Sequence, residues 1–149
     1  MISISQKCQY GLRAVFELAR RPLGKPRKIS DIAEAQAIPP RFLESILNTL
    51  KQAGVVESRR GARGGYVLAV PPGELTAGKI ISLLDGPIQP VKCIAAGGAE
   101  CPLRGKCSFL DMWTKAGSAM EDVFDKTTFQ NLLDKEAAGR PAHSTAYDI

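Results

Sequence analysis

The sequence predicts a mainly α-helical fold with one small β-hairpin. Apolar residues recur at helical spacing through most of the chain, and an arginine- and glycine-rich stretch, RRGARGG at residues 59–65, separates two short β-like runs. Of the 149 residues, 44% are hydrophobic and 23% are charged, as is usual for a globular protein. No apolar run is long enough to span a bilayer and the N-terminus lacks the features of a secretory signal, so we expect a cytoplasmic protein without a membrane partner.

The first two helices are short and are separated by a loop. Residues 4–19 carry an apolar stripe that includes Cys8 and Leu12, and the sequence RRPLGKP that follows ends this helix. Ser30 is a suitable N-cap for a second helix, which runs to about Gln36. Two consecutive prolines then mark a tight break and the start of a third helix.

The third helix, residues 40–52, is amphipathic and is suited to lie in the major groove of DNA. Leucine and isoleucine side chains form its apolar face, and Gly54 ends it. Its opposite face carries polar side chains that can contact base edges and phosphates, namely Arg41, Glu44, Ser45, Asn48 and either Lys51 or Gln52.

The predicted β-hairpin follows directly, with β-like runs at residues 55–58 and 66–70. Its loop carries Arg59, Arg60 and Arg63 among three glycines, which allows charge and backbone to approach phosphates or the minor groove. Helix, short helix, tight turn, helix and hairpin are the ordered parts of a winged helix-turn-helix. We therefore expect a DNA-binding domain over residues 1–72.

The charge distribution agrees with a polyanionic partner for this half only. Residues 1–72 hold 12 Lys and Arg against 5 Asp and Glu, a net charge of +7, whereas residues 73–149 have a net charge of −2. A basic first half is typical of proteins that bind nucleic acid, and we expect the partner to be a double-stranded DNA operator.

Residues 73–135 are predicted to form a cysteine loop flanked by helices. One helix covers residues 76–84, a long one covers residues 108–125, and a short one covers residues 128–135. Residues 136–149 are small or polar without periodicity, so we expect a disordered tail. The long helix has an apolar stripe made of Leu110, Trp113, Ala116, Met120 and Phe124.

This long helix predicts a homodimer. A single amphipathic helix cannot close a core alone, and packing against a second copy would also supply the two-fold symmetry that paired DNA half-sites require. The alternative is that the stripe packs within the monomer. The fold class as a whole is therefore a winged helix-turn-helix plus a long dimerisation helix.

Three of the four cysteines lie in the segment CIAAGGAECPLRGKC, residues 93–107. In a reducing cytosol such a cluster indicates metal binding or redox chemistry and not a persistent disulfide. Thiolate sulfur suits both iron–sulfur clusters and zinc, but the absence of a closely spaced cysteine pair makes a zinc ribbon less favoured.

The chain resembles the Rrf2-type transcriptional regulators, the family of IscR, NsrR and RirA. The resemblance covers about residues 1–135 and rests on three segments: QYGLRAVFELA, IPPRFLESILNTLKQAGVVESRRGARGGYVLA and the three-cysteine loop. It implies a homodimer whose loop cysteines, here Cys93, Cys101 and Cys107, hold an iron–sulfur cluster. It also implies that Glu44 and its neighbours read DNA, with Arg59, Arg60 and Arg63 on the wing.

The fourth cluster ligand is open. Leu110 stands where the IscR pattern has a histidine, and the only histidine, His143, lies in the predicted tail. Cys8 on the first helix is the expected donor, with Gln9 as its rival and a buried core residue as the alternative reading of Cys8. Either a two-iron (2Fe-2S) or a four-iron (4Fe-4S) cluster is compatible with these residues.

We therefore expect a transcription regulator whose operator affinity is switched by the cluster, through redox, nitric oxide or iron. Two alternatives stay open: a cluster-free regulator that senses through thiol oxidation, and a zinc-binding interaction module. An enzyme is not expected, because the chain has no cofactor fingerprint and no nucleophile–base pair.

Overall fold

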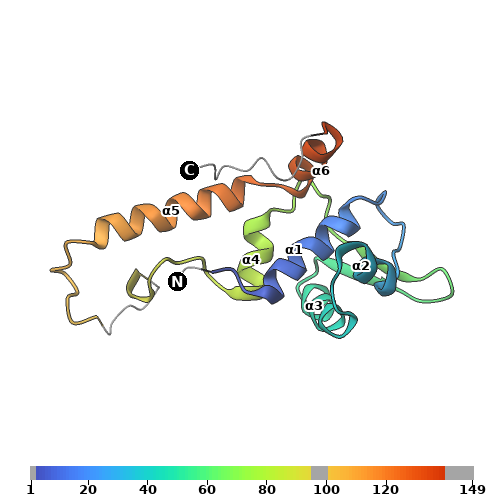
Figure 1. Cartoon of the computed structure of the whole chain (residues 1–149), viewed down its shortest axis with the longest axis horizontal. Helices are drawn as coiled ribbons and strands as arrows, with labels where there is room; N and C mark the ends of the chain where they lie inside the picture. The colour runs from blue at the N-terminus through green and yellow to red at the C-terminus, as the bar shows by residue number, and fades with distance from the viewer. Residues whose placement is uncertain (1–2, 95–100, 140–149) are drawn as a thin grey trace.

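The computed structural model describes residues 3–94 and 101–139, and within those ranges it is mostly helical with one two-stranded antiparallel sheet. The predicted fold class is confirmed. Figure 1 shows α5 extending away from the unit that contains α1, α2, α3 and the hairpin. The elements are α1 (Gln6–Ala19), α2 (Ile29–Gln36), α3 (Pro40–Gln52), β1 (Val56–Arg59), β2 (Gly65–Leu68), α4 (Ala77–Asp85), the 3-10 helix η1 (Lys92–Ile94), α5 (Leu110–Lys126) and α6 (Phe129–Ala137).

Helix α1 begins two residues later than predicted because Ser5 caps it. The Ser5 hydroxyl accepts a hydrogen bond from the Cys8 amide at 3.1 Å, which satisfies one of the unpaired donors of the first turn. The Ser5 hydroxyl and amide in turn donate to the two carboxylate oxygens of Asp85, at 2.5 and 2.8 Å. The start of α1 is thereby tied to the end of α4.

The predicted cap at Ser30 is wrong. Helix α2 begins at Ile29, Lys28 occupies the cap position, and no side chain caps this helix. The Ser30 hydroxyl instead donates to the carboxylate of Asp31 at 3.2 Å. The break before α3 is as expected: Ala37 adopts a left-handed conformation with φ of 48°, and Pro40 opens α3.

One apolar core joins elements from both halves of the chain. Val15 of α1, Ile80 of α4 and Phe129 of α6 are each fully buried in the same cluster as the apolar face of α3. Helices α4 and α6 therefore pack on the helix-turn-helix, although they follow residue 72, where we expected the first domain to end. The buried face of α3 is the predicted one and consists of Leu43, Ile46, Leu47 and Leu50.

Backbone hydrogen bonds join the start of α4 to the start of α6. The amide of Ala77 donates to the carbonyl of Thr127 at 2.8 Å, and the amide of Phe129 donates to the carbonyl of Leu75 at 3.0 Å. Thr76 caps α4 and Thr128 caps α6, the second through a reciprocal capping box. Helix α6 reaches Ala137, two residues further than predicted, and residues 140–149 of the predicted tail lie outside the described residues.

The C-terminal half of the apolar stripe predicted on α5 packs within the monomer. Met120 and Phe124 contact a buried cluster made of Cys8, Ile81 and Ile88. Leu110, at the start of the predicted stripe, is 45% accessible to solvent, and Phe109, Met112 and Val123 beside the stripe are exposed as well, at 62%, 48% and 63%. The sequence pattern identified the amphipathic helix but did not show which part of it packs within the monomer.

Within residues 3–94 and 101–139, we find no helix with the length and apolar character needed to cross a membrane.

Candidate nucleic-acid interface and cysteine loop

The polar face of α3 forms an open hollow of about 400 Å³. Four of the predicted DNA-contacting residues line it together, and two further side chains join them; the six are Arg41, Glu44, Ser45, Asn48, Thr49 and Gln52. Thr49 was absent from the predicted set, and Gln52 was predicted only as the alternative to Lys51; their spacing of four and seven residues from Ser45 places both on the same helical face. Lys51 lies apart from the hollow, since its ammonium group donates to the Ser58 hydroxyl of β1 at 2.8 Å.

The start of α3 is held by aromatic contacts with α1. The rings of Tyr10 and Phe42 lie 6.4 Å apart between centroids. Arg13 stacks over the Tyr10 ring at 5.6 Å, and Arg41 stacks over the Phe42 ring at 4.8 Å. These contacts orient the first turn of α3, where Arg41 and Glu44 enter the hollow.

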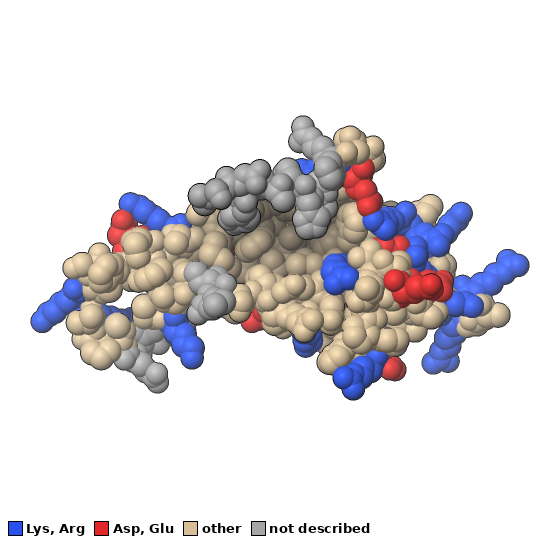
Figure 2. Space-filling view, viewed as in Figure 1, with Lys and Arg blue, Asp and Glu red and all other residues tan. Residues whose placement is uncertain are grey.

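The hairpin places its arginines at one end of the molecule. β1 and β2 pair in register from Val56 opposite Leu68 to Arg59 opposite Gly65. Arg59 forms an ion pair with Glu57 at 3.1 Å on the same strand, whereas Arg60 and Arg63 are exposed in the loop. Figure 2 shows Lys and Arg side chains projecting from the end of the molecule that carries the hairpin.

The three loop cysteines flank a segment that lies outside the described residues, 95–100. Cys93 lies in η1, while Cys101 and Cys107 lie in the turns before α5, and all three are partly exposed. Three thiols suit an iron–sulfur cluster in donor chemistry. In the part of the chain that the structure describes, however, no three His, Cys, Asp or Glu side chains are gathered into a metal site.

Cys8 is buried and protonated. Its side chain is fully inaccessible, and burial together with the nearby charge of Asp85 raises the pKa of its thiol from 9.0 to about 11. A protonated thiol is a poor nucleophile, and this one is enclosed with Ile81 and Ile88. Its predicted rival Gln9 is exposed, and the Gln9 amide nitrogen donates to the carbonyl of Ile4 at 3.0 Å.

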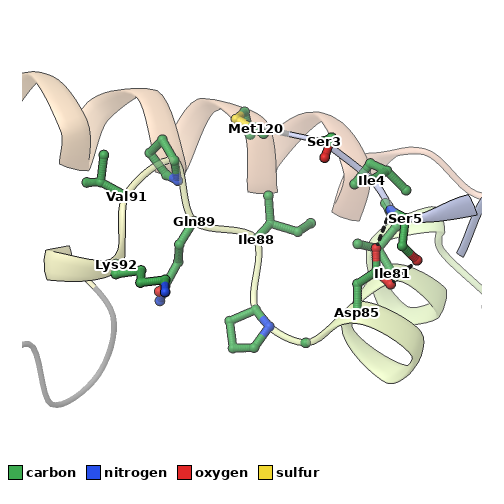
Figure 3. A pocket seen from close by; sticks show the side chains of 13 residues that line it. Ser3, Ile4, Ser5, Ile81, Asp85, Ile88, Gln89, Val91, Lys92 and Met120 are labelled. Carbon is green, nitrogen blue, oxygen red and sulfur yellow. Dashed lines mark hydrogen bonds between the residues drawn. The ribbon is translucent and has the colours of Figure 1, made fainter. Parts of the chain in front are cut away.

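The segment before Cys93 lies against α5. Gly117 is buried there, and a methyl group at its position would come within 3.2 Å of Pro90 and 3.4 Å of Ile94, the residue after Cys93. The same segment borders a cavity of about 610 Å³ between the start of α1, the end of α4 and α5. Figure 3 shows Ser5 and Asp85 on one side of this cavity and Gln89 and Lys92 on the other.

An exposed polar helix after a tight turn, beside an arginine-bearing hairpin, defines the winged helix-turn-helix class of DNA-binding proteins. Comparison with known proteins identifies the family within this class. The Rrf2 family model, described as an iron-dependent transcriptional regulator, matches residues 4–135. The chain belongs to the Rrf2 family of transcriptional regulators and is not an enzyme.

Individual relatives agree in sequence and in fold. The HTH-type transcriptional regulator CymR of Bacillus subtilis (strain 168) is 37% identical over 131 residues, which is 88% of this chain and 89% of CymR. Its solved structure, described as that of the global cysteine regulator of B. subtilis, superposes with a TM-score of 0.73 over 89% of this chain and 96% of that one. The T. potens IscR structure is 30% identical with a TM-score of 0.74, covering 95% of this chain and 93% of that one.

A third solved structure, the oxidized form of Staphylococcus aureus CymR, is 34% identical and has a TM-score of 0.67. The superposition covers 87% of this chain and 94% of the S. aureus CymR chain.

The raised pKa of Cys8 predicts a specific loss of stability at high pH. The native state holds the Cys8 proton more tightly than the unfolded chain, so this stabilisation is complete below about pH 9 and disappears as the pH rises through about 11. In urea unfolding from pH 8 to 11, the stability advantage of the wild type over Cys8→Ala should shrink by about 2 to 3 kcal/mol. A constant difference between the two proteins would contradict the shift.

Proposed function

We propose that this chain is a homodimeric regulator that binds a double-stranded DNA operator in the cytoplasm. We further propose that its operator affinity depends on the state of Cys93, Cys101 and Cys107, with an iron–sulfur cluster as the group they hold. The observation that carries the DNA-binding part is the exposed polar face of α3 beside the arginine-bearing hairpin.

The α3 face offers the chemistry needed to read bases. Asn48 can pair with adenine through both ends of its amide, and Glu44 can accept from the exocyclic amine of cytosine. On the hairpin, Arg60 and Arg63 are placed to bind phosphates or to enter the minor groove, which provides affinity with little sequence preference.

These two roles predict different mutant behaviour. Asn48→Ala should weaken binding to the preferred operator by about 1–3 kcal/mol and leave binding to unrelated duplexes nearly unchanged. Arg60→Ala should weaken binding to both duplexes. It should also reduce the slope of log affinity against log salt concentration by about one, the value expected for the loss of one phosphate contact. Fluorescence anisotropy across a salt series measures both quantities, and Lys115→Ala on α5 is a matched control for loss of an exposed cation. Equal behaviour of Asn48→Ala and Arg60→Ala would contradict the assignment.

The exposed stripe of α5 supports the homodimer. Met112, Ala119 and Val123 are all exposed and lie at spacings of seven and four residues, so they form one face of the helix. Large apolar side chains of a helix that remain in contact with water are typical of an interface, and a second copy of the same face is the simplest partner for a DNA-binding protein.

A charge on this stripe should break the dimer. Val123→Glu is expected to shift the mass measured by light scattering after size exclusion from dimer to monomer. Ser118→Glu introduces the same charge at an exposed position on another side of α5, and it should leave the mass unchanged. A Val123→Glu protein that stays dimeric would place the interface elsewhere.

The iron–sulfur proposal is supported by three thiols in one short segment, by the iron-dependent description of the family and by the similarity to IscR. Cys93, Cys101 and Cys107 would be the protein ligands, and such a cluster would supply a centre sensitive to oxidation and to iron supply. For the fourth position, the enclosure of Cys8 with Ile81 and Ile88 favours the exposed Gln9.

The path from the loop to the DNA-binding unit is short in this fold. Ile94 follows Cys93 directly and packs on α5 at Gly117, and the preceding linker borders the cavity closed by Asp85 and Ser5. A change in the loop therefore acts on the junction between α5, α4 and the start of α1. Two arrangements of this junction with different operator affinities would make a switch.

A cluster-free thiol regulator is the second candidate. Two observations favour it: the described residues show no gathered metal ligands, and a CymR relative has been solved in an oxidized form. In this case oxidation of partly exposed loop thiols, without iron, would change operator affinity.

Anaerobic purification separates the candidates. The cluster proposal predicts a coloured protein with bound iron and acid-labile sulfide, and Cys101→Ala should lose both and change operator affinity in the same anisotropy assay. Ser108→Ala, next to Cys107, should retain both. A colourless, iron-free protein whose affinity follows oxidant and reductant would instead establish the thiol mechanism. Stoichiometric zinc without duplex binding at low salt would favour an interaction module.

A further inference from the structure

Glu17 of α1 is the only charged side chain that the described residues bury in the core, with 2% of its surface accessible. A buried carboxylate persists only when it is paired and hydrogen-bonded. Its Oε2 accepts hydrogen bonds from Arg20 Nη1 at 2.9 Å and from Gln36 Nε2 at 2.6 Å, and its Oε1 pairs with Arg27 Nη1 at 2.6 Å. Two cations and one amide therefore converge on a single carboxylate.

The Gln36 contact connects Glu17 to the reading helix. Gln36 is the last residue of α2, and only the tight turn at Ala37 to Pro39 separates it from α3. The amide of Ile38 in this turn bonds back to the carbonyl of Ala33 at 2.9 Å, so the turn is closed on α2. Holding the end of α2 against α1 thus fixes where α3 begins.

The Arg27 contact connects Glu17 to the wing. The backbone of Arg27 forms an antiparallel bridge with that of Tyr66 in β2. The Arg27 amide donates to the Tyr66 carbonyl at 2.9 Å, and the Tyr66 amide donates to the Arg27 carbonyl at 2.8 Å. The two backbones approach closely at Gly65, the residue before Tyr66, because a side chain at Gly65 would come within 2.3 Å of the Arg27 carbonyl oxygen. The base of the wing is therefore attached to the backbone of Arg27, whose side chain is anchored on α1.

We propose that Glu17 is a positioning residue for operator recognition, because it holds the reading helix and the wing in one fixed spacing. The inference rests on the proposed DNA contacts of α3 and the hairpin. Specific binding requires both elements to meet their groove positions together, and hydrogen bonds to base edges are lost within a fraction of an ångström to an ångström of displacement. Non-specific binding depends on the number of phosphates neutralised and tolerates a change of spacing.

The network has an outer arm that supplies a control. Arg20 also forms an ion pair with Glu136 of α6, with Arg20 Nε donating at 3.1 Å, and 48% of the Glu136 side chain is exposed. This arm touches neither α2 nor the wing. Glu136→Gln removes one carboxylate of the same network while leaving the links to Gln36 and Arg27 intact.

The test compares two duplexes with the full-length protein. One is an operator selected by the wild-type protein from a randomised pool, and the other has the same composition in shuffled order. Glu17→Gln is nearly isosteric and removes the charge that holds Arg27. We expect its dissociation constant for the selected duplex to rise by about tenfold or more, and that for the shuffled duplex to stay within about twofold. Glu136→Gln should match the wild type on both.

A merely structural role for Glu17 would lower the melting temperature without changing the ratio of the two affinities in the folded protein. An unchanged ratio in folded Glu17→Gln, or an equal loss in Glu136→Gln, overturns the proposal. If Glu17→Gln does not fold, Arg27→Met and Gln36→Met decide. Each removes one link, and an unchanged ratio in both also overturns it. A wild-type protein that selects no duplex would contradict the proposed function itself, independently of Glu17.

Discussion

Helix α1 is the constraint on which the rest of the structure depends. It packs against α2, α3, α4, α6 and β2, and its fully buried Ala14 and Val15 lie in the common core. Gly11 leaves room for Leu84 of α4, since a side chain there would come within 2.2 Å of it. Because DNA-binding elements and the elements next to the cysteine loop contact the same helix, neither group can move far without moving against α1.

The parts that the sequence predicted well are those set by local pattern. The apolar face of α3 has strong helical periodicity, and the prolines and glycines around it mark its ends, so its boundaries were predicted correctly. The hairpin was predicted because an arginine- and glycine-rich loop separates two β-like runs. The class of fold followed from the order of these elements, and the family relatives confirm it.

Most of the misses concern contacts between residues distant in sequence. The pattern on α5 showed one apolar stripe but not that α4 covers its part with Met120 and Phe124. Ser30 satisfied a local capping rule, yet the cap lies two residues earlier, at Lys28. Glu17 was only one acidic residue among apolar neighbours, and nothing local indicated that Arg27 and Gln36 would reach it. The loop cysteines and their fourth ligand stay predictions, because the spacing of thiols along a chain does not determine which further side chain meets them in space.

The closure at Thr76 and Thr128 has an evolutionary consequence. The isolated bridge between Thr76 and Thr128, with the Ala77–Thr127 and Phe129–Leu75 hydrogen bonds, brings the start of α4 next to the start of α6. Helix α4 packs in the common core, and the linker after it and α5 form an excursion outside that core. Insertions, deletions or new ligand spacings at the far end of this excursion need not propagate into the reading helix. Proteins that share this fold can therefore diverge in the segment between α4 and α6 while they keep the same reading helix and wing.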